Sequence, residues 1–587
     1  MRSGRTLGIA AWFFSSGCIA GVPPQPTVPV TSRVERPEPE TFDVKQPFPD
    51  EARLEEITSK PAADPSTSLG EAPATVDRWS LAGPLPSSAG RIAFTSDDPE
   101  RTRAAAIIAK QRDGFQATAG MMCFAHEYAR FVAAHDRPPP VDIQMFISGR
   151  CGTTVTQWHV RTLKGSKIHP DRVLADRRKV AELFADMPDG SQVGIGWDEG
   201  ESQRVIVIAA GRPDVEIEPV RLDGVPKASV VIRGKVVWPI EWLNAHVTRG
   251  ELGYERCETI TEASGRNGEF GVECSVDPKD PLAFIEIVAA QRGALMGRAV
   301  LTLGVSPDGS APHDYVVSMQ PLPVDDGDRR PEALVAGINA VRERAKVDPL
   351  RLSPEQSTVA QNLFEHMQGQ DDVSVKNEIA LGIMAGWQVE GTIREGGFKV
   401  APANREWPLA RLLAGSLASP SFRSVALDPD ADIVAVGQLE SARSGARSVL
   451  WATYDMFEPK DFGEEEAILL GELDAQRAAL GLDAVARMDG RQDREALEAS
   501  ARRIRNHEAS PPDELQAVLS HFASTMRGRV QGIVLAPMRI DGWRPEFPEA
   551  LLKAKHVAVA VKISYFKPEG AAWGQHVVLL VFTELDG

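Results

Sequence analysis

The chain has 587 residues and a formal net charge of -17, with ordinary fractions of apolar and charged residues. A chain of this length is too long for one hydrophobic core and divides into about three to five domains. The negative charge argues against nucleic acid or an anionic membrane surface as the main partner, because phosphate binding depends on clustered Lys and Arg.

The first 18 residues have the pattern of an export signal. Arg2 and Arg5 form a short basic region, residues 6–14 are mostly apolar but too few to span a bilayer, and small residues lead to Cys18. The run ending at Cys18 resembles a bacterial lipoprotein signal, in which the cysteine is acylated and becomes the mature N-terminus, although Ser15 stands where such signals usually place Leu. The alternative is an ordinary cleaved signal in which Cys18 has no role.

Residues 19–78 are rich in Pro, Glu, Ser and Thr and poor in large apolar side chains. This composition predicts a disordered, Pro-rich tether that holds the folded domains away from a membrane. No later segment has the length and apolar character of a transmembrane helix. We therefore expect an exported protein of the cell envelope, at the outer membrane or cell surface, whose only membrane contact is the N-terminal lipid anchor.

The four cysteines that follow Cys18 form two local pairs, Cys123 with Cys151 and Cys257 with Cys274. Their even number and short separations predict two disulfides in an oxidising compartment. Zinc binding is a competing interpretation, but the sequence has no C-x-x-C and its spacings do not match a zinc module. Four free thiols are the third possibility.

Residues 79–215 open with helical patterns over 101–115 and 121–135 and close with two strand-like runs. Residues 216–322 instead contain short β-branched runs separated by turn signals, which predict a small antiparallel β-sandwich. An acidic linker follows over 321–331.

Two further stretches, residues 330–457 and 463–587, repeat the plan of helices followed by a closing hairpin. The run INAVRERAKVDPLRL, which begins at Ile338, is similar in sequence to LDAQRAALGLDAVAR, which begins at Leu473. The stretch Ile108–Arg112 has the same spacing from an apolar residue to Arg. A repeat of about 130 residues is too long for a solenoid, so each copy needs its own core. We interpret the pattern as one domain that occurs up to three times.

The stretch 330–457 resembles the CAP superfamily, which includes cysteine-rich secretory proteins, antigen 5 and pathogenesis-related plant proteins. The resemblance is carried by INAVRERAKVDPLRLSPEQSTVAQNLFEHM, by NEIALG near the family's Glu-Asn-Ile-Ala turn, and by SLASPSFRSVALDPDADIVAVGQLE, which follows its Ser-Pro-Gly-His-Arg segment. It implies an α-β-α sandwich with helices covering a small antiparallel sheet.

Residues 79–215 and 463–587 are CAP-like by internal similarity and element order. The three stretches are named units one (79–215), two (330–457) and three (463–587) below. The expected fold class is multidomain α+β, with up to three CAP-like α-β-α sandwich units and one all-β sandwich domain.

Members of the CAP family resemble one another in two His and two acidic residues that converge on a cleft and can bind a divalent metal. In unit two the resemblance places the His positions on Leu363 and Phe422, and the acidic position of the Glu-Asn turn on Asn377, with Glu378 displaced by one. Leu and Phe offer no lone pair to a metal or a proton. The resemblance therefore implies a degenerate metal site in unit two.

Weak candidates for ligand or groove residues remain elsewhere. Glu365 and His366 are neighbours on a predicted helix, where adjacent side chains point about 100° apart and seldom share a site, so a solvated pair is the favoured interpretation. His126 and Glu127 stand where unit one would keep its first His, and His159 is the nearest candidate for a second.

Unit three contains His507, His521, His556 and His576 without a common context, and a lone His on a strand is more often packed than a ligand. The sequence has no G-x-S-x-G, H-E-x-x-H or phosphate-binding loop, and an isolated Ser or Cys is not a nucleophile without a base placed beside it. We therefore predict no catalytic residue, no metal and no cofactor.

These patterns favour a binding or interaction module over an enzyme. The expected partner is an envelope component, namely a cell-wall polymer, a lipid or another protein, and not nucleic acid. Two alternatives are a metal-dependent hydrolase centred on unit one, with His126 as a ligand, and a structural spacer of the envelope. Trp387, Trp407 and Trp451 are candidate groove residues for a binder, with core packing as the alternative role.

Overall fold

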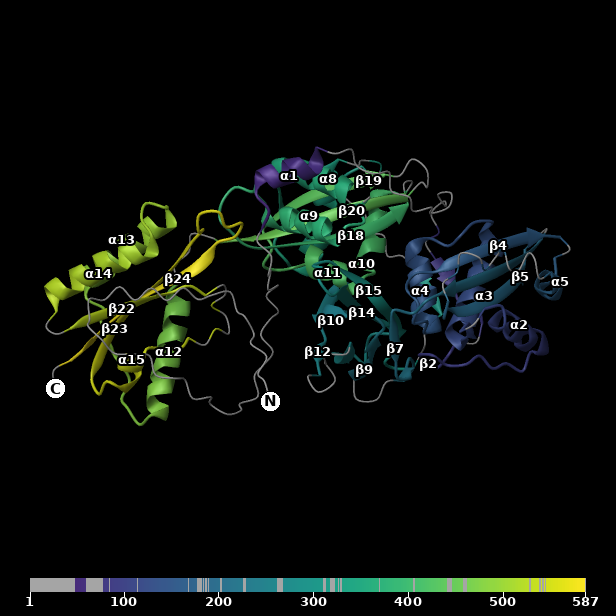
Figure 1. Ribbon diagram of the computed structural model, residues 1–587, viewed down its shortest axis with the longest axis horizontal. Helices are drawn as coiled ribbons and strands as arrows, with labels where there is room; N and C mark the ends of the chain where they lie inside the picture. Colours follow the sequence, from purple (N-terminus) through teal and green to yellow (C-terminus); the bar gives the residue numbers. More distant parts are fainter. Residues whose placement is uncertain are drawn as a thin grey trace. The chain divides into compact units, whose positions relative to one another are not determined.

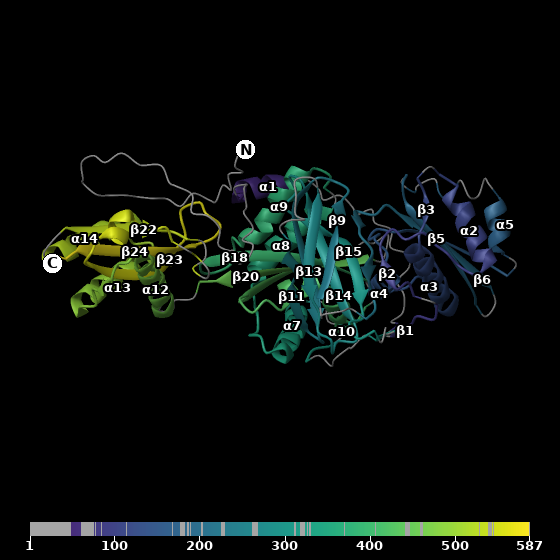
Figure 2. The same ribbon diagram turned by 90° about the horizontal axis from the view of Figure 1, so that it is seen from below.

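Figure 1 shows the computed structural model of the chain, and Figure 2 shows it after a turn of 90°. The structure describes residues 48–585 except for several gaps. The longer gaps are 60–75, 177–181, 225–228, 261–267, 310–312, 317–322, 441–445 and 458–461, and the others are one or two residues long. The chain divides into a larger body, residues 49–384 and 397–454, and a C-terminal body, residues 385–396 and 455–587 with Phe48.

The fold is mixed α+β, with several small sheets on which helices pack. Three four-stranded sheets, one in each of units one, two and three, share one strand order. In each sheet the first strand along the chain is parallel to the third, the third and fourth form an antiparallel hairpin, and the second lies beside the fourth at the opposite edge. The closing hairpins expected from the sequence are the central pairs of these sheets.

Unit one packs its longest helix directly on its sheet. Its elements are α2 (Pro99–Ala109), α3 (Ala119–His135), α4 (Val141–Cys151), α5 (Pro170–Ala175), β3 (Gln116–Ala117), β4 (His159–Gly165), β5 (Gln192–Glu199) and β6 (Arg204–Gly211). The Thr118 hydroxyl caps α3 by accepting from the Met121 backbone N–H, and Asp136 ends the helix in the left-handed region. A Cβ at Gly196 of β5 would lie 2.2 Å from the His126 backbone nitrogen, so only glycine allows this approach.

Residues 215–305 form a β-domain of two four-stranded antiparallel sheets around one core. One sheet contains β7 (Val215–Ile217), β9 (Ser229–Val236), β12 (Glu258–Thr259) and β13 (Glu269–Ser275); the other contains β10 (Ile240–Arg249), β11 (Gly253–Arg256), β14 (Ala283–Gln291) and β15 (Gly297–Val305). Alternate residues of the strands, such as Ile232, Val247, Ile285 and Leu303, point into the shared core. Two short pairs flank the domain, β1 (Arg78–Ser80) with β16 (Asp314–Val316) and β2 (Ser88–Ala89) with β8 (Val220–Arg221).

Unit two follows the β-domain. Its elements are α7 (Pro331–Ala345), β17 (Arg351–Leu352), α8 (Pro354–Gln368), α9 (Val373–Ala385), β18 (Ile393–Asn404), α10 (Leu409–Leu417), α11 (Pro420–Ala426), β19 (Ile433–Glu440) and β20 (Ala446–Met456). A buried ion pair connects it to unit one, because Arg411 of α10 lies 2.5 Å from Asp142 of α4 and the Tyr315 hydroxyl donates to the same carboxylate at 2.8 Å. Removing one partner of a buried pair of this kind is strongly destabilising.

The C-terminal body contains unit three as three layers. Its elements are α12 (Gly463–Ala479), β21 (Ala486–Arg487), α13 (Arg491–Arg505), α14 (Pro511–Thr525), β22 (Val530–Leu535), α15 (Glu549–Lys553), β23 (Val557–Phe566) and β24 (Gln575–Glu584). On β24, Val578 and Leu580 pack with α12 and α15, whereas Val577 and Leu579 pack with α13 and α14. Helices therefore cover both faces of the sheet (Figure 1).

The arginine shared by the repeated stretches binds backbone carbonyls. The Arg342 side chain of α7 is fully buried, and its Nε donates to the Asp348 carbonyl at 2.6 Å. Its Nη1 donates to the carbonyls of Ala426 and Asp428 at 2.9 and 3.0 Å, and its Nη2 to that of Ala431 at 3.1 Å. One guanidinium thus satisfies carbonyls at the end of α11 and in the loop before β19.

Arg477 of α12 repeats this arrangement in unit three. Its Nε donates to the Asp483 carbonyl at 2.9 Å, six residues along the chain as in unit two, and its Nη1 donates to the Leu551 carbonyl of α15 at 2.7 Å. Arg112 donates to the Phe184 carbonyl at 3.1 Å in unit one. In units two and three the repeated stretch therefore positions a buried arginine that fastens the first helix to a later segment of the same unit, whereas the Arg112 side chain is 36% exposed.

Part of the range expected to be a tether is helical. Residues Glu51–Thr58 form α1, which begins at Asp50, whose carboxylate accepts from the Arg53 backbone N–H at 2.8 Å. Leu54 and Ile57 are buried, and Leu54 packs at Gly382 of α9. The apolar pair gives α1 a face to bury, which the overall composition of 19–78 concealed. The export signal, Cys18 and most of the tether lie outside the described residues.

Within the described ranges, no helix has the length and apolar character needed to cross a membrane.

Candidate functional site

The two His positions implied for unit two are filled by core side chains. Leu363 of α8 and Phe422 of α11 are each 1% exposed. The Phe422 ring meets the Trp451 ring edge-on, with centroids 5.9 Å apart. Both side chains therefore contribute packing, and neither can donate an electron pair to a metal.

The two polar positions of unit two bond to other parts of the larger body. The Asn377 side chain donates to the Gly293 carbonyl at 2.6 Å and accepts from the Leu295 backbone N–H at 2.9 Å, so it holds the turn between β14 and β15. Glu378 accepts from both Nε and Nη2 of Arg53 on α1. The four positions together do not fit a metal ion, because two lack ligand atoms and two have intramolecular partners.

A carboxylate of the β-domain enters the loop at the start of α11. Glu286 of β14 is 4% exposed and accepts from the Ser419 and Ser421 hydroxyls at 2.7 and 2.8 Å and from the Ser421 backbone N–H at 3.2 Å. Burial by itself raises the pKa of Glu286, but the charge of Lys399 and the bonds from the two serines outweigh it and hold that pKa below its ordinary value. Ser421 thus donates to a weak base and is not an activated nucleophile.

His246 lies beside this carboxylate on the same sheet. Strand register places Arg256, His246 and Glu286 directly opposite one another on β11, β10 and β14. Burial lowers the pKa of His246 to about 4; the neighbouring Glu286 opposes this shift, and the cations Arg256 and Lys399 add to it. His246 Nδ1 is buried and has no hydrogen-bond partner in the described part of the chain. Arg256, His246 and Glu286 thus form a row of polar side chains at the contact between the β-domain and unit two, and His246 is neutral there.

Sequence reasoning missed Glu286, His246 and Lys399. The hydrogen bond from Ser419 to Glu286 joins residues 133 positions apart. No local pattern of charge or hydrophobicity marks such a contact, although Ser419 and Ser421 stand within the quoted stretch SLASPSFRSV.

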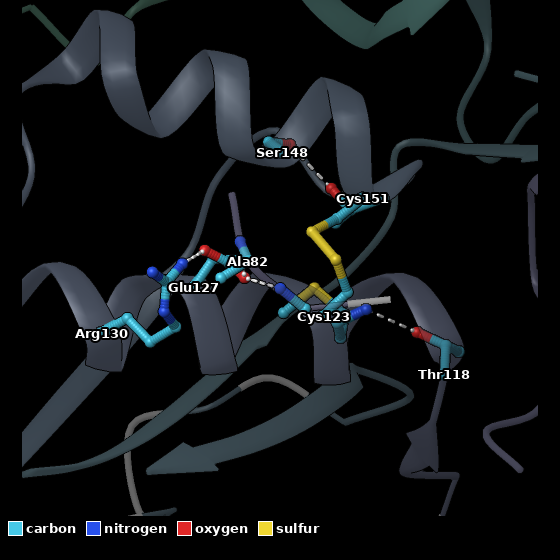
Figure 3. Close-up of a disulfide and its surroundings, with 10 residues drawn as sticks. Ala82, Thr118, Cys123, Glu127, Arg130, Ser148 and Cys151 are labelled. Carbon is cyan, nitrogen blue, oxygen red and sulfur yellow. Dashed lines mark hydrogen bonds and ion pairs between the residues drawn. A yellow bond between two sulfur atoms is a disulfide. The ribbon is translucent and has the colours of Figure 1, made fainter. Parts of the chain in front are cut away.

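Glu127 of unit one is occupied by structural bonds. Its carboxylate is 1% exposed and accepts from the backbone N–H groups of Ala82 and Gly83 at 3.2 and 2.9 Å. Its other oxygen lies 2.5 Å from Arg130 Nη1, one turn along α3 (Figure 3). Glu127 therefore fastens residues 82–83 to α3.

His126 stands apart from a second histidine. Burial lowers its pKa to about 4, and the nearby Arg101 adds to this effect, with Nη2 3.3 Å from His126 Nε2. A cation at this distance opposes the binding of a metal ion. His159 is exposed at the start of β4, an edge strand of the sheet. Strand β6 separates β4 from β5, and His126 of α3 packs against β5 at Gly196. The two histidines do not form one site.

Glu365 and His366 of α8 also point to different partners. Glu365 accepts from Gln361 at 2.6 Å, whereas His366 Nδ1 lies 2.8 Å from the Asn362 carbonyl.

In unit three, His521 Nε2 lies 3.2 Å from Asp493, and His576 is buried against Phe457 and Phe462. His507 and His556 are exposed. Across the described residues, no group of three or more His, Cys, Asp or Glu side chains is arranged to hold a metal ion.

The four later cysteines form disulfides in the expected pairs. Cys123 of α3 is bonded to Cys151 at the end of α4, and Figure 3 shows this bridge between the two helices. Cys257 is bonded to Cys274 in the β-domain. Disulfides persist in oxidising compartments, so both bridges point to an exported protein.

The three candidate tryptophans have different environments. Trp407 and Trp451 are each 1% exposed and belong to the core of unit two. Trp387 follows α9, is half-buried, and has the Lys567 ammonium 5.1 Å from its ring centroid. Core packing thus accounts for two of the three.

No protein-family model matches the chain, and no curated protein is similar to it. Among solved structures, an extracellular protein containing a SCP domain from Bacillus anthracis str. Ames is similar at 12% identity with a TM-score of 0.17. The match covers 42% of this chain and 89% of that one. Likeness at this level does not assign the chain to a family.

Proposed function

We propose that this chain is an exported protein of the cell envelope that binds an envelope component and does not itself catalyse a reaction. The observation that carries the proposal is that the four positions of unit two where the CAP resemblance implies metal ligands are occupied by packed or hydrogen-bonded side chains. Leu363 and Phe422 are packed in the interior, and Asn377 and Glu378 bond to the β-domain and α1. A metal-dependent enzyme needs ligand atoms and an open coordination position, and these residues supply neither.

Units one, two and three are, in this proposal, CAP-like copies of one domain. The support is the common strand order of their sheets and an arginine that binds carbonyls in each of them, which is fully buried in units two and three. Duplication of a domain whose metal-ligand positions are not kept fits a role in binding, because a binding scaffold uses the surface of each copy and does not need catalytic groups. Cys18 is the proposed site of lipid attachment.

The test is co-sedimentation of the full chain with envelope preparations. Intact envelopes are compared with lipid-extracted, protease-treated and polymer-digested ones at equal protein concentration. We expect saturable binding to intact envelopes and its loss after one of the three treatments, which identifies the partner as lipid, protein or polymer. An absence of binding to intact envelopes would overturn the proposal.

A further inference from the structure

Among the residues that the structure describes, Lys567 of the C-terminal body has no carboxylate partner. It follows β23 in the turn before β24, and its side chain is half-buried. Glu569 and Glu390, the acidic residues nearest in sequence to Lys567 and Trp387, are exposed, and among the described residues none forms an ion pair with Lys567. Burial lowers the pKa of its ammonium group.

Another lysine of the same body shows the usual arrangement. Lys562, five residues earlier on β23, is also partly buried, and it pairs with Glu466 at 3.2 Å and Glu498 at 3.1 Å. A lysine removed from water normally has such a partner, because desolvation of an unpaired charge is unfavourable. In a chain with a net charge of -17, a half-buried ammonium that pairs with no carboxylate of the described residues is a position at which an anion can bind.

Trp387 supplies the second element of this position. Its indole lies under Lys567 Nζ, 5.1 Å from the ring centroid, and the side chain is half-buried rather than part of a core. The aromatic ring holds the ammonium in place by a cation–π contact and presents apolar surface next to it. Aromatic side chains beside a charged group are typical of ligand sites.

We propose that Lys567 and Trp387 form a binding site for a carboxylate-bearing saccharide. Such a ligand carries an anion to pair with the ammonium and, at a fixed short distance, an apolar C–H face of a sugar ring to pack on the indole. A single ammonium fits one carboxylate, whereas phosphate-rich ligands are usually bound by clustered arginines or backbone nests. The inference rests on the proposed envelope-binding function and names the polymer class that this site recognises.

The experiment measures binding of a glucuronic acid oligosaccharide to the full chain by calorimetry at low ionic strength. A glucose oligosaccharide of the same length and a Glu-rich peptide serve as the competing ligands. We expect the acidic saccharide to bind at least about tenfold more tightly than either, since one charge-assisted hydrogen bond is worth about that factor. Equal affinity for the neutral saccharide or for the peptide would overturn the assignment.

Three variants separate a binding role from a structural one. Lys567→Met should weaken binding about tenfold while leaving the melting temperature unchanged or raised, because it removes an unpaired half-buried charge. Lys567→Arg should retain most of the affinity, and Lys555→Met, which removes an exposed lysine of the same body, should have no effect.

Loss of stability in Lys567→Met, or unchanged affinity in it, would contradict the proposal. If the wild-type chain binds intact envelopes but not the acidic saccharide, the site assignment fails and the proposed function stands. If it binds neither, both fail.

Discussion

Replacing Arg342 by Met tests whether the repeated stretch exists to place a buried arginine. Arg342→Met keeps the length of the side chain and leaves the carbonyls of Asp348, Ala426, Asp428 and Ala431 without their donor. Bonds from a charged donor contribute about 1.5–3 kcal/mol each, but they share one guanidinium whose burial is itself unfavourable. We therefore expect the free energy of unfolding of the larger body to fall by about 4 kcal/mol, below the sum of the four.

The chain provides its own matched variant for this measurement. Arg477→Met removes the equivalent donor from the C-terminal body. Hydrogen exchange, read on β19 and β20 for one body and on β23 and β24 for the other, separates local stabilities where a single melting temperature does not. Each variant should accelerate exchange in its own body. Unchanged exchange in both bodies would refute the assigned role of the arginines.

Three other perturbations have defined outcomes. Phe422→Ala should lower the free energy of unfolding of the larger body by about 3–5 kcal/mol, as for other buried Phe residues. Excess zinc or a chelator should leave the wild-type melting temperature unchanged, and a melting temperature that rises with zinc would show that other residues form a metal site. His246 has a folded pKa of about 4, so the stability that depends on its neutral form is fully present above pH 6.5 and is lost as the pH falls toward 4. Between pH 6.5 and pH 4, the free energy of unfolding of His246→Gln should therefore fall by about 2 kcal/mol less than that of the wild type, after allowance for solvent screening. An identical pH profile of the melting temperature would contradict this. Cys18→Ser should move the protein from the membrane to the soluble fraction, and unchanged partition would exclude the anchor.

Local patterns were enough to predict parts of the fold. The closing hairpins of the three units follow from β-branched runs with short turns, and the cysteine pairs follow from even number and short separation. The sequence similarity between the stretches that begin at Ile338 and Leu473 is matched in the structure, because the sheets of units two and three have the same strand order. It could not reveal that the shared arginine binds carbonyls, because Arg342 and Ala431 are 89 residues apart.

Contacts between domains were beyond prediction for the same reason. Glu286 and Ser421 lie on different domains, and nothing near either residue indicates a buried carboxylate. The short helix α1 was hidden in a segment whose composition is typical of disorder, since two apolar residues, Leu54 and Ile57, suffice to dock it. An isolated helix of this length is marginal in water, so its formation depends on the surface it contacts.

We propose that the chain binds an envelope component without metal-dependent chemistry. The most direct test is a binding isotherm of the full chain on intact envelopes, measured once with a chelator and once with excess zinc. We expect the same saturable binding in both conditions and no release of soluble envelope fragments. Binding that disappears with the chelator, or fragments released only with zinc, would contradict it.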